Sequence, residues 1–276
     1  MGRKKIIIDK IVLEKLYAKN NLSPQKISLL FDCNWATVIN RLKEHNIPLK
    51  TPAKARMKYL KQDFKGQIQE KAYMIGFRIG DLNVYRPGPT SETIVVRCHS
   101  TQTEQVDVFN SLFKKYGHIR LSKGSYGVHM ATYLNNSFVF LLPKGDDAWD
   151  WLIKNEDAYS AFIAGYTDAE GNFILNQGRA RFKIDSYDYS ILANISKWLM
   201  SQGINNKFRQ INKIGDPQGV NGQYHGDLWR LNVNDASSVE NFIKCILPYL
   251  RHKIRIKDAK TCLKNITNRR NNGTVR

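Results

Sequence analysis

Two acidic residues close two copies of one short stretch of sequence. The first copy runs from Ala72 to Asp81, and the second runs from Ala161 to Glu170 at the same offset throughout. A small residue stands at every fourth position: Ala72, Gly76 and Gly80, then Ala161, Gly165 and Ala169. This spacing places small residues on one helix face, and glycine lets two helix backbones approach closely. Two such helices, packed together, would bring the two carboxylates side by side.

Adjacent carboxylates that face no cation repel each other and resist ionisation. They are sensible partners if they share divalent metal ions, because Mg²⁺ favours one or two carboxylates together with substrate phosphates. Such sites hydrolyse phosphodiesters by activating water and stabilising the leaving oxygen. Either copy alone indicates only tight helix packing. Two copies in fixed register favour a metal site that contains Asp81 and Glu170.

The sequence around each copy predicts the same order of elements: helix, strand, strand, helix, strand, strand, helix. Alternation of apolar and polar residues predicts strands, and apolar residues three and four apart predict helices. In the first half the expected elements after the motif are 83–85, 93–99, 105–116, 118–122, 126–133 and 137–142. In the second half they are 172–176, 179–185, 189–200, 207–209, 228–231 and 239–250.

Composition favours a nucleic-acid partner. The chain has 276 residues, 42% of them hydrophobic, and a formal charge of +19. The positive charge is concentrated in residues 1–70 and 251–276, which points to a polyanion. No apolar run is long enough to span a membrane and no signal-like start is present. The four cysteines are far apart, which fits a reducing compartment. We therefore expect an intracellular, DNA-containing location, without membrane association or secretion.

Residues 11–45 contain a pattern typical of a helix-turn-helix. Ser23 and Pro24 are a good cap and first residue for one helix, and Asn34 can cap a second after a tight turn. The second helix would then present Trp35, Thr37, Asn40 and Arg41 to a DNA groove. An ordinary helical hairpin packed on the next domain is the alternative, and the basic surroundings favour DNA contact.

The two copies resemble the paired motifs of LAGLIDADG homing endonucleases in their single-chain form. The resemblance covers about residues 70–264 and is closer in the second copy, Ile163–Gly171. In the first, Arg78, Ile79 and Leu82 depart from the family pattern. It implies an α+β fold of two pseudo-symmetric αββαββα repeats that form a saddle on DNA. It also implies that Asp81 and Glu170 are the catalytic, metal-binding acids, with Mg²⁺ or Mn²⁺.

The resemblance further implies a catalytic lysine after the last core helix. Lys253 is the candidate, with a phosphate-contacting role as the alternative, and Lys144 is a weaker counterpart in the first half. The outward-facing polar residues of the strands would contact DNA bases or phosphates, since Arg and Lys pair with guanine and phosphate. These candidates are Arg97, His99, Arg120, Arg179, Arg181, Lys183, Lys207, Arg209 and Arg230.

The sequence therefore predicts five segments: a helix-turn-helix domain (1–48), a basic linker (49–66), two LAGLIDADG repeats (67–150 and 151–266) and a basic tail (267–276). The predicted function is a monomeric, site-specific endonuclease that makes metal-dependent double-strand breaks in a long, asymmetric DNA target. Two alternatives stay open. One is a non-catalytic DNA-binding regulator on the same fold, and the other is an intron RNA maturase that uses the basic ends.

Overall fold

The structure, a computed structural model, describes residues 6–50, 59–144, 150–219 and 222–275. The chain divides into two compact bodies, Met1–Leu60 and Lys61–Arg276. Residues 51–58 of the predicted linker (49–66) lie outside the described residues. From Gln62 onward the chain packs within the larger body, where the Gln62 N–H donates a hydrogen bond to the Tyr116 carbonyl at 2.8 Å.

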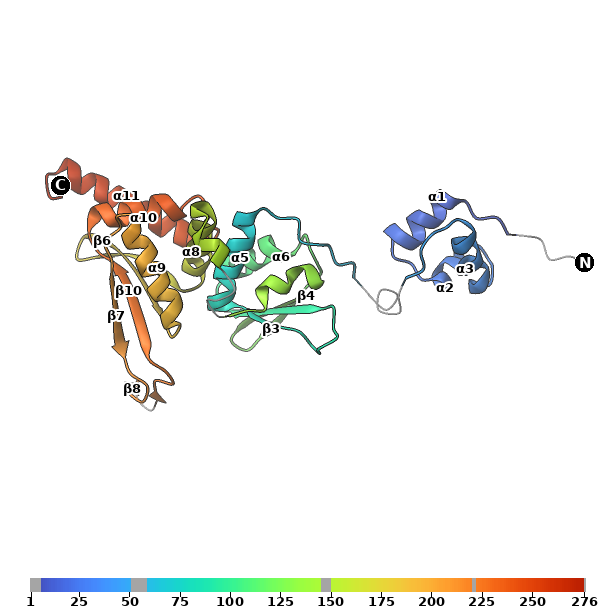
Figure 1. Cartoon of the computed structure of the whole chain (residues 1–276), viewed down its shortest axis with the longest axis horizontal. Coiled ribbons are helices and arrows are strands. Elements are labelled where there is room, and N and C mark those ends of the chain that lie inside the picture. The colour runs from blue at the N-terminus through green and yellow to red at the C-terminus, as the bar shows by residue number, and fades with distance from the viewer. Residues whose placement is uncertain (1–5, 51–58, 145–149, 220–221, 276) are drawn as a thin grey trace, which may run out of the picture. The chain divides into compact units, whose positions relative to one another are not determined.

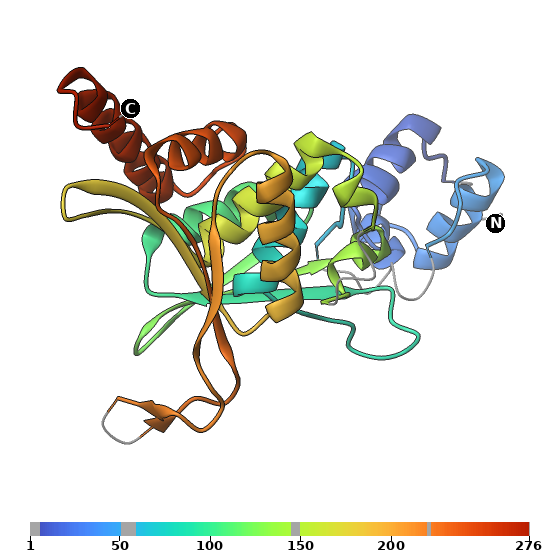
Figure 2. The ribbon, with the colours of Figure 1, turned by 60° about the vertical axis from the view of Figure 1, so that its left-hand side comes forward.

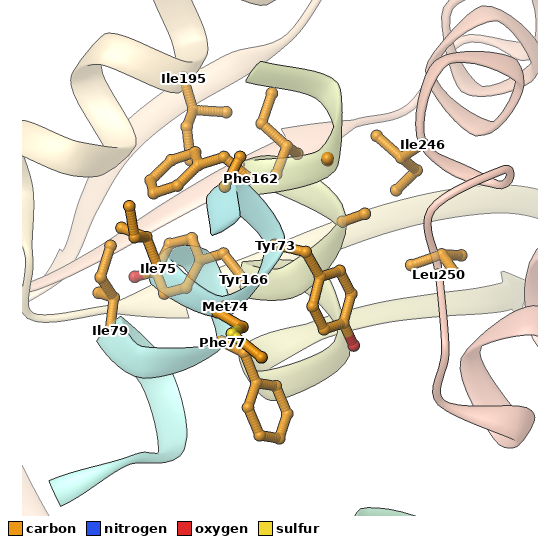
Figure 3. Close-up of a cluster of buried hydrophobic side chains, with 14 of the residues drawn as sticks. Tyr73, Met74, Ile75, Phe77, Ile79, Phe162, Tyr166, Ile195, Ile246 and Leu250 are labelled. Atoms are coloured by element: carbon orange, nitrogen blue, oxygen red, sulfur yellow. The ribbon is translucent and has the colours of Figure 1, made fainter. Parts of the chain in front are cut away.

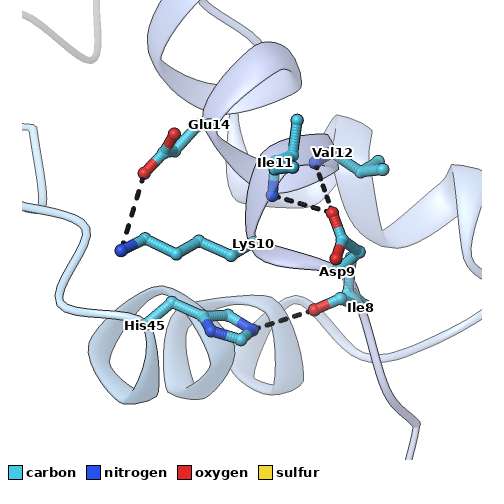
Figure 4. Close-up of polar contacts among 7 residues, drawn as sticks. All are labelled: Ile8, Asp9, Lys10, Ile11, Val12, Glu14 and His45. Atoms are coloured by element: carbon cyan, nitrogen blue, oxygen red, sulfur yellow. Dashed lines mark hydrogen bonds and ion pairs between the residues drawn. The ribbon is translucent and has the colours of Figure 1, made fainter.

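The smaller body is made of short helices: α1 (Lys10–Leu13), the π-helical η1 (Glu14–Lys19), α2 (Pro24–Leu30) and α3 (Trp35–Glu44). The predicted caps form, since Ser23 accepts from the Lys26 N–H and Asn34 from the Ala36 N–H. Asp9 caps α1 in the same way, and His45 at the end of α3 bonds the Ile8 carbonyl (Figure 4). The segment before α1 is thus hydrogen-bonded to the end of α3, the last helix described in the smaller body.

The larger body contains the two predicted repeats (Figure 1). The first is α5 (Ile68–Asp81), β1 (Asn83–Tyr85), β2 (Ile94–Ser100), α6 (Thr103–Phe113), β3 (Ile119–Gly124), β4 (Gly127–Leu134) and the 3₁₀ helix η2 (Asn136–Leu141). The second is α7 (Asp150–Ile153), α8 (Glu156–Glu170), β5 (Gly171–Asn176), β6 (Arg179–Ser186), α9 (Tyr189–Ser201), β7 (Lys207–Asn212), β10 (Leu228–Val233) and α10 (Ala236–Ile246). Both main sheets are antiparallel, with the matching orders β1-β2-β4-β3 and β5-β6-β10-β7. The predicted α+β fold with a repeated αββαββα unit is confirmed.

Beyond the second sheet, the connection between β7 and β10 carries a further hairpin, β8 (Pro217–Gln218) and β9 (Gly222–Gln223). It extends away from the sheet (Figure 2). No helix in the described ranges is long and apolar enough to cross a membrane.

The helices α5 and α8 cross at their glycines. A Cβ on Gly76 would lie 2.0 Å from the Phe162 carbonyl oxygen, and one on Gly165 would lie 2.1 Å from the Tyr73 carbonyl oxygen. The two contacts are equivalent and nearly equal in length, so the two backbones touch about a pseudo-twofold axis. Apolar side chains of both helices fill the space around the crossing, together with Ile195 from α9 (Figure 3). The small-residue spacing in the sequence is explained by this contact.

A long C-terminal helix, α11 (Lys253–Asn271), spans the end of the predicted second repeat and the first half of the predicted basic tail. Its buried residues are Ala259, Cys262 and Ile266, which belong to the main core. It lies against β5 and β6, where the Asn265 amide donates to the Gly178 carbonyl at 3.1 Å. Despite its basic composition, this segment therefore forms an amphipathic helix, which completes the second repeat.

Candidate metal site and nucleic-acid surface

Asp81 and Glu170 are the last residues of the crossed helices α5 and α8. A Cβ on Gly80 would lie 2.9 Å from the Glu170 Cγ and 3.4 Å from its Oε1. The Glu170 carboxylate therefore lies over the residue that precedes Asp81. The helix crossing brings together the two acids that the sequence pattern pairs.

Both acids are held in surroundings that oppose their ionisation. Burial raises the pKa of Asp81 to about 7, and the negative charge of Glu170 adds to this, while a hydrogen bond from the Gln105 amide and the charge of Arg255 act in the other direction. The pKa of Glu170 is also raised, mainly by burial and then by Asp188, although its side chain reaches solvent. Charged acids at such a point need a compensating cation.

Arg255, in the first turn of α11, is a cation close enough to act on both acids. Burial raises the pKa of Asp81, Glu170 and the nearby Asp168, and the charge of Arg255 opposes that rise in all three. The sequence pattern does not predict Arg255 as a site residue, because the last helix that it predicts ends at residue 250 and α11 begins after it. Had the helix been expected, the buried face formed by Ala259, Cys262 and Ile266 would have placed Arg255 on the inner side.

Lys253 lies elsewhere in the structure. Its side chain is 73% exposed, and its Nζ pairs with the Asp107 carboxylate at 2.6 Å. That hydrogen bond raises the pKa of Lys253. Its catalytic role stays a prediction. The weaker candidate, Lys144, contributes a favourable charge at Glu170.

Asp168 joins the two repeats to the start of α11. Its buried Oδ2 accepts hydrogen bonds from the Tyr73 hydroxyl at 2.6 Å and from the N–H groups of Arg251 and His252 at 2.7 and 3.0 Å. The Arg251 guanidinium also lies 4.7 Å from the centre of the Tyr73 ring. Asp168 therefore fixes the turn from which α11 carries Arg255 to the acids.

The first motif, which departs from the family pattern, makes different structural contacts from the second. Ile79 stands at the position that corresponds to Asp168, and the neighbouring Arg78 is buried. Its guanidinium donates to the carbonyls of Leu141 and Leu82. In the second repeat, the Asp168 carboxylate accepts hydrogen bonds from the turn before α11. In the first repeat, the Arg78 guanidinium instead donates hydrogen bonds to backbone carbonyls.

The outer faces of the two sheets are hollowed, and polar side chains line both. The hollow on the first sheet has a volume of about 370 Å³ and includes Arg97, His99 and Arg120, with Asp81 at its border. The hollow on the second sheet has a similar volume and includes Arg181, Lys183, Lys207, Arg209 and Arg230. Arg179 is exposed at the start of β6 and does not line it. Eight of the nine strand candidates therefore gather on two matching surfaces.

Arg230 is already engaged within its hollow. Its Nε and Nη2 each donate to the Asp185 carboxylate at 2.6 Å. A bidentate pair of this kind fixes the guanidinium plane, and it also occupies donors that a guanine would need.

One expectation for the smaller body is wrong. Arg41 does not face outward: it is buried, its Nε donates to the Ile6 carbonyl at 2.7 Å, and its guanidinium pairs with Glu44. The long side chain folds back to satisfy the N-terminal segment. Trp35 and Asn40 are exposed as expected, and Thr37 is half-buried. Their contact with DNA stays a prediction, as does the helix-turn-helix assignment.

The two acids fit a magnesium-type ion. Over the ranges that the structure describes, no group of three or more His, Cys, Asp or Glu residues is placed to enclose a metal. Mg²⁺ does not need such a cage, since it is commonly held by one or two carboxylates plus phosphates and water. A bound cation would also lower the pKa of Asp81 from its raised value of about 7, because it favours the ionised carboxylate.

Comparison with known proteins identifies the fold. Residues 157–247 match the family model of the LAGLIDADG-like domain. A crystal structure of I-DmoI in complex with DNA and Ca covers 70% of this chain and 97% of its own, with a TM-score of 0.51 and 17% identity. A structure of mesophilic variants of the homing endonuclease I-DmoI covers 66% and 96%, with a TM-score of 0.48 and 18% identity.

Full-length DUF199/WhiA from Thermatoga maritima also matches, over 75% of this chain and 63% of its own, with a TM-score of 0.45 and 15% identity. No curated protein sequence matches significantly. The I-DmoI match with a TM-score of 0.51 shows the fold, and the family match lies in the second repeat. Residues 157–247 therefore form a LAGLIDADG-like domain, and the fold is similar to that of I-DmoI.

Proposed function

We propose that this chain is a divalent-metal-dependent, site-specific DNA endonuclease that cuts both strands of an asymmetric target. The observation that carries the proposal is the meeting of Asp81 and Glu170 at the ends of the crossed helices, between two sheets with cationic hollows. The I-DmoI structure of similar fold holds DNA and Ca. Two unlike repeats in one chain suit an asymmetric site read by a monomer. Its proposed location is an intracellular compartment that contains DNA.

Asp81 and Glu170 would hold Mg²⁺ or Mn²⁺, which when bound lowers the pKa of an attacking water and stabilises the leaving oxygen. The other residues prepare this site. Gln105 orients the Asp81 carboxylate through its amide. Arg255 offsets the negative charge of both acids before the metal arrives. The cations on the sheets neutralise DNA phosphates and contact base edges.

The experiment is incubation with a randomised duplex-DNA library, in Mg²⁺ or in EDTA, followed by sequencing of cut ends. The proposal expects one recovered sequence, cut only with Mg²⁺, and no cutting by Asp81→Asn or Glu170→Gln. Glu92→Gln is the matched control, because Glu92 is an exposed acid of the first repeat away from the helix ends. Cutting by both acid variants at the normal rate would refute the proposed site.

A non-catalytic DNA-binding protein is the second candidate. The observation that favours it is the first motif, where Ile79 replaces an acidic position and Arg78 is committed to structure. The same library separates the two, because this candidate selects a sequence and leaves it uncut. Selection of structured RNA in a parallel RNA library would instead support the maturase.

A further inference from the structure

Two histidines face each other on the outer surface of the first sheet. His99 on β2 is the register partner of His129 on β4, and both side chains are exposed. Their ring centres are 4.4 Å apart, with the planes inclined by 41°. Directly opposed residues of antiparallel strands project to the same side. Each neutral imidazole offers one nitrogen lone pair, so a pair this close can share one ion.

The Nε2 atoms of both rings point toward two glycines that have no side chains to block them. A Cβ on Gly124 would lie 2.9 Å from the His129 Nε2, and a Cβ on Gly127 would lie 3.2 Å from the His99 Nε2. Gly124 and Gly127 are themselves register partners at the end of β3 and β4. Both nitrogens therefore lie at the same corner of the sheet, each against a glycine, and the Ser100 carbonyl oxygen is close to Gly127 there.

Gly127 and Gly124 differ in what they need. Gly127 has a φ of 125°, a conformation that requires glycine for backbone reasons. Gly124 is not among the residues with positive φ. At Gly124 the backbone would accept a side chain, and only the His129 ring stands in its way.

We propose that His99 and His129 form a binding site for a divalent transition-metal ion such as Zn²⁺, Ni²⁺ or Cu²⁺, with water completing the coordination. Imidazole suits these ions, whereas the two acids at the helix ends suit Mg²⁺, so the two sites differ in metal class. Arg97 and Arg120 line the same hollow and oppose a cation, and Asp81 at its border favours one. The site is therefore one of modest affinity, open to solvent on one side.

Such an ion would compete with DNA, a consequence that rests on the proposed function. His99 is one of the residues expected to contact the DNA groove, and a bound ion would occupy its ring nitrogen. Metal and DNA would then weaken each other's binding by the same factor, because coupling between two ligands is reciprocal.

The test titrates the full-length, chelator-treated protein with Ni²⁺ by calorimetry and with Cu²⁺ by electron paramagnetic resonance, without DNA. The proposal expects a site whose Cu²⁺ spectrum shows nitrogen ligands, lost in His99→Gln and in His129→Gln. Each substitution should weaken binding by at least about tenfold, the lower end of what even an outer-shell partner contributes. His225→Gln, which alters an exposed histidine on another loop, should leave this site unchanged.

Gly124→Ala is the sharpest variant, because its methyl group would displace the His129 Nε2 while both histidines remain in the chain. It should weaken Ni²⁺ binding to the same degree, with an unchanged circular dichroism spectrum. Equal Ni²⁺ affinity in wild type, His99→Gln and Gly124→Ala would overturn the proposal. Since these titrations contain no DNA, their failure is distinct from a failure of the proposed nuclease function.

Discussion

Replacing Asp81 with asparagine should stabilise the protein at alkaline pH while removing the proposed metal site. Asp81 has a pKa of about 7 in the folded chain, against 3.8 for an ordinary aspartate. The folded state thus binds more protons than the unfolded state between these values. Stability must therefore fall as pH rises from about 4 to about 7, and then stay level as far as this residue is concerned.

The size of the effect follows from the same two values. Their difference corresponds to at most about 4 kcal/mol of destabilisation when the carboxylate is fully ionised. The Glu170 charge contributes to that cost and is coupled to it, so part of the cost stays with Glu170 when Asp81 is replaced. We expect Asp81→Asn to gain about 1–4 kcal/mol at about pH 8.5 and less than half of that at about pH 5, because the unfolded carboxyl is already largely ionised there.

Urea unfolding in EDTA, followed by tryptophan fluorescence, measures this gain. The signal reports largely on the larger body, since Trp151, Trp198 and Trp229 lie in it. Adding Mg²⁺ should stabilise wild type and not Asp81→Asn, and so shift the difference by about 2.7 kcal/mol toward wild type at 100 times the dissociation constant. An Asp81→Asn protein no more stable than wild type at about pH 8.5, or equally stabilised at both pH values, would refute the electrostatic reasoning.

Three further predictions test the surrounding structure. Gly76→Ala should destabilise the protein by about 3 kcal/mol or more in urea, because its methyl group would overlap the facing helix backbone, whereas Gly88→Ala has open space and should be neutral. Asp168→Ala should cost about 3 kcal/mol, by removing a charged acceptor from three donors, and should speed hydrogen exchange at the start of α11. Arg255→Gln should move the pH–rate profile of cleavage to higher pH, since the pKa of both acids would rise, and Arg255→Lys should largely restore it.

Each of these has a contrary outcome. Full stability of Gly76→Ala would mean that the helices do not touch at that glycine. Normal exchange in Asp168→Ala would mean that the turn before α11 is held by other contacts. An unmoved pH profile in Arg255→Gln would separate that arginine from the acids.

The repeats could be predicted because their signals are local. The small-residue spacing, the alternating strands and the breaks between them each fix an element without knowledge of its neighbours. Pairing the two motifs then places Asp81 beside Glu170, since the same packing face is present in both. The sequence did not predict the order of strands within each sheet, which depends on pairing between distant segments.

The misses come from contacts that are distant in sequence. Helix α11 buries only Ala259, Cys262 and Ile266 at its core face, too few apolar residues to stand out from its lysines and arginines. Because this helix was not predicted, the position of Arg255 on it was not predicted either. Arg41 was expected on the surface because nothing nearby in sequence shows that the Ile6 carbonyl lies within its reach. Long cationic side chains often pack along the body and bond backbone oxygens, and sequence patterns do not record this.

The hydrogen bond between Asp168 and Tyr73 limits how the halves of this protein can be exchanged. Tyr73 belongs to the first repeat, and the residue in the corresponding place of the second is Phe162, which has no hydroxyl. A symmetric protein assembled from two copies of the second repeat would keep the glycine crossing but would bury each Asp168 against a phenyl ring. Chimaeras that join this second repeat to a foreign partner therefore need a tyrosine at that position, or a neutral residue in place of Asp168.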